Sequence, residues 1–360
     1  MNTDILIVGG GLSGLALADK LERAGVKNWS LIEASERLGG RIYSPQICEA
    51  NFDLGPSWFW PGQHRVEQLL RRFNLNVFEQ FSKGMRVLQD EQGKNHPNRG
   101  YASMEGSLRI AGGMGRLIEN LRKTLPNEKI CLSTPLTSLN YDGHLIHAKA
   151  GKKKITAERV VLATPPRVAM KTIEFNPALP RDVFNTLTSI ATWMAGQAKI
   201  IAVFDQPYWR QNGFSGDAMS LRGPMTEIHD ASPIDETQYA LFGFVGVPSN
   251  FRVSHQDQLL QLAKQQLVNI FGRELSNPTD IRIQDWAQIP EIATSLDQKG
   301  IREHPNYGYP NVLKNLWDGR LKFGSTEMAE IYGGYLEGAL ESAEYIFHEI
   351  MNGSDGYTVN

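Results

Sequence analysis

An α/β fold with two domains is predicted by three features of this sequence. A buried strand, a tight glycine turn, a helix and a second strand follow one another within residues 4–33. Several strand-like runs come next, and a last long amphipathic helix is expected at about residues 334–350. The 360 residues exceed what one hydrophobic core usually holds, so we expect two domains that share a cleft.

The N-terminal unit is the clearest element. Residues 4–8 form an apolar run typical of a buried strand, and the helix that follows carries its apolar residues on one face. Gly25 is expected to end this helix, because glycine readily adopts the conformation found just past a helix end. Residues 29–32 are then predicted as the second strand.

The later elements are predicted from apolar runs and from periodicity. An amphipathic helix is expected at 258–271. Lysines 152–154, next to Gly151, could form a polyanion site or a solvated hairpin tip, and we favour the hairpin tip. The further strand candidates are 129–132, 159–163, 199–204, 239–245, 281–286 and 321–323.

Composition limits the possible partners. Charged residues make up 21% of the chain and the net charge is -2, so no nucleic-acid partner is expected. The first strand begins close to the initiator methionine, which favours a cytoplasmic protein without a leader segment. No apolar run reaches the ~20 residues of a membrane-spanning helix, so no membrane anchor is expected. Two cysteines, Cys48 and Cys131, are too few for a thiolate metal site, and we predict no metal.

The glycine turn has the pattern of a dinucleotide-binding site. Gly9, Gly11 and Gly14 match G-x-G-x-x-G between a strand and a helix, with Leu12 and Ser13 at the helix start. These glycines allow a tight turn, approach of the backbone to a pyrophosphate, and close packing of helix on strand. Glu33, at the end of the second strand, is placed to bind a ribose diol. This unit alone is compatible with NAD or FAD.

Two further glycine-rich segments favour FAD. After Ala34, residues Gly39 and Gly40 can bring backbone close to a ligand, and Arg41 can contact phosphate, although a salt-bridged turn is the alternative. Near the C-terminus, Thr326 and Glu327 follow a strand. Gly334, Tyr335 and Leu336 then open a helix whose amides could meet a flavin or its ribityl chain, with ordinary packing as the alternative.

Taken in order, these segments resemble the flavin-containing monoamine oxidase family, in a short form. Gly55, Pro56, Ser57 and Trp58 look like the family segment that approaches the isoalloxazine ring, and Leu136 lies where the family contacts adenine. Residues 112–114 resemble the return into the FAD domain, and residues 160–180 resemble the crossover into the substrate domain. The resemblance implies a discontinuous, Rossmann-like FAD-binding domain with a mixed α+β substrate domain.

The resemblance also implies roles for single residues. Lys199 matches the lysine that holds a water near flavin N5, Trp286 matches a tryptophan beside the flavin, and Tyr335 matches one wall of an aromatic cage for the substrate amine. Lys199 and Tyr335 are therefore the expected catalytic residues. The residues predicted to bind FAD are Gly9, Gly11, Leu12, Ser13, Gly14, Glu33, Ala34, Gly40, Arg41, Gly55, Pro56, Ser57, Trp58, Leu136, Trp286, Thr326, Glu327, Gly334, Tyr335 and Leu336.

The chain departs from the family pattern at three places. Residues 294–297 contain no cysteine that could tether a flavin, so noncovalent FAD is expected. Leu296 stands where the second cage tyrosine would be. The segment between Arg41 and Gly112 is much shorter than in large amine oxidases, so most of the helical lid over the substrate is expected to be absent. The candidates to complete the cage are Tyr307, Tyr309, Trp58 and Trp60, and the candidates to line the site are Met104, Tyr101, His64 and His229.

Three functions remain open from the sequence. The first is oxidation of an amine, with a hydride passing from the alpha carbon to flavin N5 and reoxidation by oxygen or another acceptor. The second is oxidation of a dihydropyridine, a porphyrinogen or a polyene, and the third is a non-catalytic flavin-binding module. The predicted FAD domain comprises 1–60, 106–172 and 292–352, the substrate domain comprises 61–105 and 173–291, and 353–360 form a polar tail.

Overall fold

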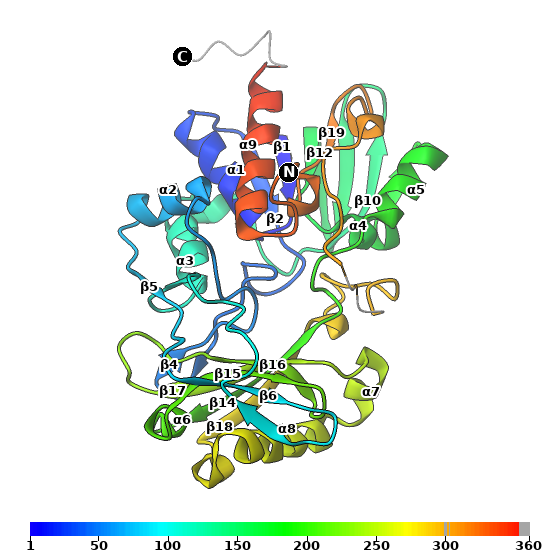
Figure 1. Ribbon diagram of the computed structural model, residues 1–360. Coiled ribbons are helices and arrows are strands. Elements are labelled where there is room, and N and C mark those ends of the chain that lie inside the picture. Colours follow the sequence, from blue (N-terminus) through cyan, green and yellow to red (C-terminus); the bar gives the residue numbers. More distant parts are fainter. Residues whose placement is uncertain (299–300, 302, 353–360) are drawn as a thin grey trace.

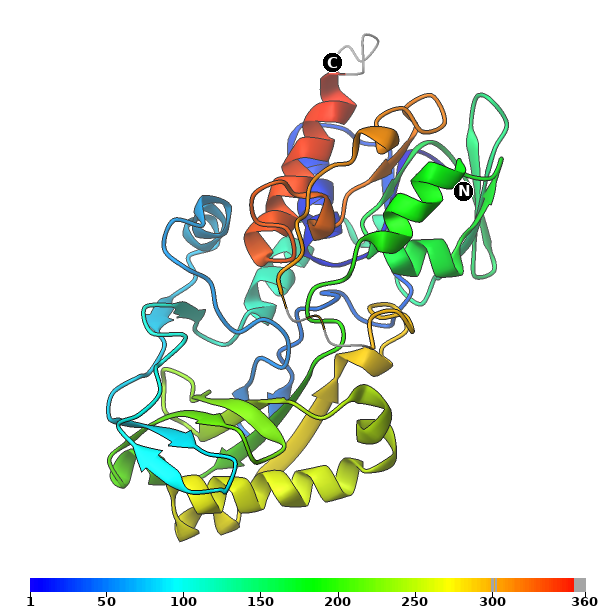
Figure 2. The same cartoon turned by 45° about the vertical axis from the view of Figure 1, so that its right-hand side comes forward.

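The computed structural model describes residues 1–298, 301 and 303–352, so the predicted tail lies outside the described residues. Two large β-sheets make up most of the architecture, and several segments of irregular chain connect them (Figure 1). Helices α1 and α9 lie side by side on the larger sheet, while α8 lies along the outer face of the second sheet (Figure 2).

The larger sheet has eight strands. Along its main path the order is β13-β10-β11-β12-β1-β2-β9, and β19 pairs with the C-terminal half of β12. Strand β1 is parallel to both β2 and β12, as expected for a strand–helix–strand unit. The strands are β1 (Asn2–Val8), β2 (Trp29–Ile32), β9 (Ile130–Cys131), β10 (Leu136–Tyr141), β11 (Ile146–Ala150), β12 (Lys153–Leu162), β13 (Glu174–Asn176) and β19 (Leu321–Phe323).

Both faces of this sheet are covered by other elements. Successive side chains of a strand point to opposite faces, so neighbouring residues of β1 pack into different layers. Ile5 and Ile7 of β1 pack against helices α1, α2, α3 and α9. Leu6 and Val8 pack against the opposite layer, which includes α4 and α5. The helices of the two layers are α1 (Leu12–Arg23), α2 (His64–Arg72), α3 (Gly115–Lys123), α4 (Pro166–Thr172), α5 (Arg181–Ser189) and α9 (Leu336–Asn352).

The second sheet has seven strands in the order β18-β14-β17-β16-β15-β6-β7. Strand β14, which lies between β18 and β17, shows the same alternation: Ile200 and Phe204 pack against α8, whereas Ile201 packs against the segment 47–54. The strands are β6 (Met85–Gln89), β7 (Asn95–Pro97), β14 (Ala198–Phe204), β15 (Phe214–Ser220), β16 (Met225–Asp230), β17 (Tyr239–Val245) and β18 (Asp280–Asp285), with helices α6 (Tyr208–Gln211), α7 (Ser249–Ser254) and α8 (Gln256–Phe271).

Short elements complete the described chain. Two small sheets pair β3 with β4 and β5 with β8. Among the described helices, none combines the length and the apolar character needed to cross a membrane. The short elements are β3 (Gln46–Ile47), β4 (Ala50–Asn51), β5 (Val77–Glu79), β8 (Leu108–Ile110) and the 3-10 turns Asn127–Lys129, Arg273–Ser276, Trp286–Gln288, Asn311–Leu313 and Thr326–Met328.

The predicted elements agree with the structure to within a few residues, with one difference of placement. The strand expected at 159–163 is the C-terminal half of the longer β12, which begins at Lys153. Lysines 153 and 154 therefore lie at the start of β12, and Gly151 and Lys152 form the hairpin turn. Lys199 is buried in β14, which has a neighbouring strand on each side.

Two helices pack on the larger sheet although the predicted division assigns them to the substrate domain. Val66 and Leu70 of α2 join the core beside α1, and Val183 and Leu187 of α5 join the core on the opposite face. Strand β13 also pairs with β10 of the larger sheet. The predicted division into domains stays a proposal.

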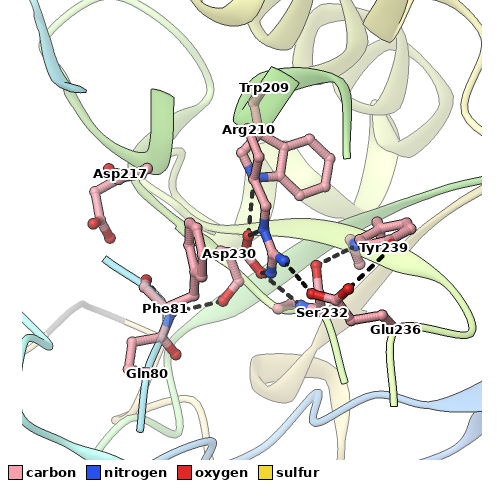
Figure 3. Close-up of polar contacts among 12 residues, drawn as sticks. Gln80, Phe81, Trp209, Arg210, Asp217, Asp230, Ser232, Glu236 and Tyr239 are labelled. Carbon is pink, nitrogen blue, oxygen red and sulfur yellow. Dashed lines mark hydrogen bonds and ion pairs between the residues drawn. The ribbon is translucent and has the colours of Figure 1, made fainter. Parts of the chain in front are cut away.

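A buried ion pair ties together the turn before β15 and the end of β16. The Asp230 carboxylate accepts hydrogen bonds from Trp209 Nε1 (2.9 Å), from Arg210 Nε (2.8 Å) and from the Ser232 amide (2.8 Å) (Figure 3). The Arg210 guanidinium lies 3.8 Å from the centre of the Phe81 ring, which brings in the chain that precedes β6. This network holds one end of the second sheet.

We predict that Asp230→Ala destabilises the fold by about 3–5 kcal/mol, because it removes the buried carboxylate that holds the Arg210 guanidinium and leaves only the exposed Glu236 as a counter-ion. The measurement is the free energy of unfolding in urea. The matched control is Glu105→Ala, which breaks the exposed ion pair with Arg86 and should cost about 0–1 kcal/mol. Equal losses in the two variants would contradict this reading of the network.

Candidate active site

A cavity of about 970 Å³ is lined by residues of both sheets. Its wall includes Val8 and Ile32 at the C-terminal ends of strands in the larger sheet, and Lys199 and Phe244 from the second sheet. Ligands of open α/β sheets bind beyond the carboxyl ends of the strands, which is where this cavity begins. Its volume suits one large organic molecule.

At the larger sheet, two glycine turns form the wall. The Gly39 amide donates to the carbonyl of Gly10 (2.8 Å), so the second turn is held against the first. A Cβ added to Gly11 would find only Gly40 Cα, at 4.0 Å, and would otherwise enter the cavity. A Cβ added to Gly14 would instead lie 2.0 Å from the Gly9 carbonyl oxygen. Gly11 therefore leaves room for a ligand, and Gly14 leaves room for the turn.

Helix α1 begins at this turn and directs its N-terminus toward the cavity. Leu12 and Ser13 line the wall, and the Ser13 hydroxyl donates to the carbonyl of Gly324, next to β19. No side chain caps the N-terminus of α1. Its first amides are therefore available to an anion, and the helix dipole adds positive potential there.

Glu33 holds the glycine turn as well as lining the cavity. Its carboxylate accepts the amides of Gly10 (2.6 Å) and Ser35 (2.8 Å). The Ser35 hydroxyl also donates to it (2.9 Å), and since a carboxylate has about four lone-pair positions, capacity remains for one hydroxyl group of a ribose. Glu33 can therefore make the expected ribose contact while it also holds the glycine turn, a structural role that the sequence did not indicate.

Several buried polar atoms in this region have no hydrogen-bond partner. The Arg41 guanidinium lies 2.7 Å from a carboxylate oxygen of Glu327, but the angles do not satisfy a hydrogen bond, and Arg41 Nη1 and both Glu327 oxygens remain unsatisfied. The hydroxyls of Thr164 and Ser325, both on the cavity wall, are also buried and unpaired. Buried polar groups are rarely left unpaired, so this arrangement is that of a polar ligand site.

The segment 53–58 forms the wall between the two sheets. Lys199 Nζ donates to the carbonyl of Gly55 (2.6 Å) and to the hydroxyl of Ser57 (2.7 Å). Trp286 Nε1 donates to the carbonyl of Leu54 (2.9 Å). The Asp53 carboxylate accepts the amide of Met114 (2.8 Å), and burial raises its pKa although a hydrogen bond from Ser44 opposes the shift.

The amine of Lys199 is buried among aromatic rings. It lies 4.2 Å from the ring centre of Phe242, 5.3 Å from that of Phe244 and 5.5 Å from that of Trp58. Burial lowers the pKa of Lys199 to about 7, although the nearby Asp53 carboxylate opposes the shift. Near neutral pH this amine can both accept and donate a proton.

Tyr335 forms the aromatic wall on the other side. The His304 ring stacks on it with centroids 5.0 Å apart and an interplanar angle of 10°. Among the aromatic candidates for the missing cage wall, Trp58 and Trp60 line the cavity, whereas Tyr307 and Tyr309 do not. Leu296 is 54% exposed and lies outside the cavity, so no residue at that position faces Tyr335.

The predicted site residues converge on this one cavity. Lys199 and every predicted FAD-binding residue line it except Gly14 and Glu327, whose contacts are described above. Met104 lines it as proposed, but Tyr101 and His64 are exposed and lie outside, and His229 lies behind the wall. Wall residues that the sequence did not single out are Arg37, Tyr43, Thr164, Trp193, Met194, Gln197, Glu227, Phe244, Gln284 and Glu291.

The family model of flavin-containing amine oxidoreductases matches residues 97–345. The chain belongs to this family. An NAD(P)-binding Rossmann-like domain model matches residues 7–73, the part that contains both glycine turns. The family assignment confirms the expected resemblance and the α/β fold. The reading as a non-catalytic module is set aside, because the protein is a flavin-dependent oxidoreductase.

Relatives in the family match almost the whole chain. Amine oxidase [flavin-containing] B of Sus scrofa is 22% identical over 459 positions, covering 97% of this chain and 86% of the relative. A Dictyostelium discoideum protein described as a flavin-containing monoamine oxidase A is 21% identical and covers 97% of each chain. Both alignments span more positions than this chain has residues, so the relatives carry segments that this family member lacks.

Solved structures show the same fold. A putrescine oxidase bound to putrescine superposes with a TM-score of 0.81 at 18% identity, covering 98% of this chain and 99% of the other. A proposed protoporphyrinogen oxidase of an Exiguobacterium species superposes with a TM-score of 0.75 at 18% identity, covering 98% and 99%.

The cofactor of this family member is FAD, and the residues present fit it. The open space at Gly11, the uncapped amides of α1 and the Arg41 guanidinium, whose Nη1 lacks a hydrogen bond, suit the dinucleotide half of FAD. The hydroxyls of Thr164 and Ser325 offer further partners along the wall. Neither cysteine lines the cavity.

We predict that Gly11→Ala weakens FAD binding by more than about tenfold, or about 1.4 kcal/mol, with little loss of folding stability. The added methyl meets no protein atom closer than 4.0 Å but occupies space that a pyrophosphate needs. The measurement is FAD affinity by fluorescence titration. Gly25→Ala is the control: its methyl meets nothing, so only the strain of a positive φ should register, as lower stability.

Lys199 should also impose a pH dependence on stability. Its folded pKa of about 7 lies below its usual value of 10.5, so between these values only the unfolded chain keeps the proton. Stability should therefore rise with pH above about pH 7, by up to about 1.4 kcal/mol per unit. Urea unfolding of the wild type and of Lys199→Met at several pH values tests this, because the variant should lack the rise. Parallel curves would contradict the assignment.

Proposed function

We propose that this protein oxidises an amine, with the uncharged nitrogen and its alpha carbon held between Tyr335 and the Lys199 side of the cavity. The observation that carries the proposal is the convergence of Lys199, Trp286 and Tyr335 on one cavity whose other end suits a dinucleotide. FAD, when bound, supplies a two-electron acceptor for a hydride. The protein's contribution is then orientation and proton transfer.

The walls of the proposed substrate end favour a neutral amine at the reacting position. Trp58, Trp60, Phe244 and Tyr335 present apolar ring surface, and removing an ammonium ion from water is costly. The Lys199 amine is held by Gly55 and Ser57 and titrates near neutrality, so it can hold a water molecule and exchange a proton with it.

We further propose that FAD is bound without a covalent link, since neither Cys48 nor Cys131 lines the cavity. Acid precipitation should then release all flavin into the supernatant. The cytoplasm is the proposed compartment.

A second candidate is oxidation of a non-amine such as a dihydropyridine, a porphyrinogen or a polyene. It is favoured by the exposed position of Leu296, which leaves Tyr335 without a tyrosine opposite it. The structural likeness to a proposed protoporphyrinogen oxidase supports the same alternative at the level of fold.

We predict that at least one class of primary, secondary or polyamines bleaches the flavin absorbance in the absence of oxygen. Lys199→Met should slow the oxidation by about 10²–10⁴-fold, because a positioned proton-transfer group is lost. Stopped-flow spectroscopy measures the rate.

The matched control is Lys322→Met, which removes a buried lysine that pairs with Glu349 outside the cavity. It should leave the rate unchanged. An intact flavin spectrum that no amine bleaches would refute amine oxidation and favour the second candidate, and an unchanged rate in Lys199→Met would refute the role of the lysine.

A further inference from the structure

A row of four side chains crosses the second sheet and lines the cavity. Glu227 of β16 pairs with Phe244 of β17, Phe244 pairs with Lys199 of β14, and Lys199 pairs with Gln284 of β18. All four residues belong to the cavity wall. Because neighbouring strands lie about 4.8 Å apart, Glu227 is about 10 Å of backbone distance from Lys199. The register of the strands therefore fixes the separation between the Glu227 carboxylate and the proposed reacting position near Lys199.

A buried histidine holds this carboxylate. His229 Nε2 lies 3.0 Å from Glu227 Oε1, and His229 Nδ1 lies 2.9 Å from Asp217 Oδ1. Ionised carboxylates offer only acceptors, so an imidazolium, which donates from both ring nitrogens, satisfies both contacts. In agreement, these hydrogen bonds raise the pKa of His229 against the opposing effect of its burial.

The cluster of these three residues carries an excess negative charge that reaches the cavity through Glu227 alone. Asp217 and His229 are 3% and 1% exposed, whereas the Glu227 side chain is 26% exposed. Two carboxylates and one imidazolium leave one negative charge. Ser103 donates to the same oxygen of Glu227 as His229 does, and within the described chain Oε2 has no hydrogen-bond partner.

We propose that Glu227 binds the second ammonium group of a diamine, and that His229 and Asp217 position its carboxylate. This inference rests on the proposed oxidation of amines and names the substrate class. One amine of the substrate is neutral between the aromatic walls near Lys199 and Tyr335. The other stays charged and donates to Glu227, with the carbon chain lying along Phe244. A charge-assisted hydrogen bond in a partly buried site gives the selectivity.

The test is binding to the FAD-loaded protein after photoreduction without oxygen, because a reduced flavin cannot oxidise the amine and binding reaches equilibrium. The probes are 1,4-diaminobutane and 1-aminobutane, measured by calorimetry. We expect the diamine to bind about 10–100-fold more tightly, the range of a hydrogen bond to a charged group. Glu227→Gln should remove this difference and leave 1-aminobutane affinity unchanged. Equal wild-type affinities, or equal losses for both probes, would overturn the inference.

The control is Glu105→Gln, which removes the same charge from a neighbouring segment outside the cavity and should preserve the preference. Asp217→Asn should reduce the preference for the diamine without changing 1-aminobutane affinity, as expected of a positioning residue. If Glu227→Gln does not retain FAD, the ratio of the wild-type affinities for 1,4-diaminobutane and 1-aminobutane still tests the inference.

The two proposals can fail separately. Selective binding of the diamine through Glu227, together with no bleaching of oxidised flavin by any amine, would refute amine oxidation but support Glu227 as the binding site of an ammonium group. Oxidation of amines with no preference for the diamine would refute this role of Glu227 but support amine oxidation.

Discussion

The hydrogen bonds from Lys199 Nζ to Gly55 and Ser57 are the contact on which the arrangement of the cavity depends. The turn at 55–57 directs a carbonyl and a hydroxyl inward, and buried polar groups of this kind need partners. Lys199 supplies them from the middle of the second sheet, and so fixes the wall of one sheet against a segment that leads from the other. A hydrophobic residue at 199 would remove the donor to the Gly55 carbonyl, so the lysine has a structural role beside its proposed chemical one.

The segment 53–58 extends this constraint to the rest of the molecule. Asp53 reaches the start of α3 through the amide of Met114, and the indole of Trp58 donates to Gln80, whose amide in turn reaches the carbonyl of Asp230. Each contact joins elements that are far apart in the sequence. The same few residues thus orient the nucleotide end and the proposed substrate end of one cavity.

The sequence was informative where a local pattern determines structure. The turn at Gly9–Gly14, helix α1 and strand β2 follow from neighbouring residues, and the family resemblance supplied Lys199 and Tyr335. Local patterns could not indicate that β14 has a neighbouring strand on each side, because its partners β17 and β18 are distant in the sequence. They also could not reveal the cluster of Glu227, His229 and Asp217, since an alternating strand pattern does not distinguish a buried histidine from a solvated one.

The alternation along β14 has a consequence for how such a protein can diversify. Its even-numbered side chains build the core under α8 and its odd-numbered ones build the wall toward the segment 47–58, so no position is free of a packing requirement. Strands β16 and β17 present side chains such as Glu227 and Phe244 to the same wall without holding the 53–58 segment by hydrogen bonds. Descendants that acquire new substrates would therefore accumulate replacements on β16 and β17, while β14 would change slowly.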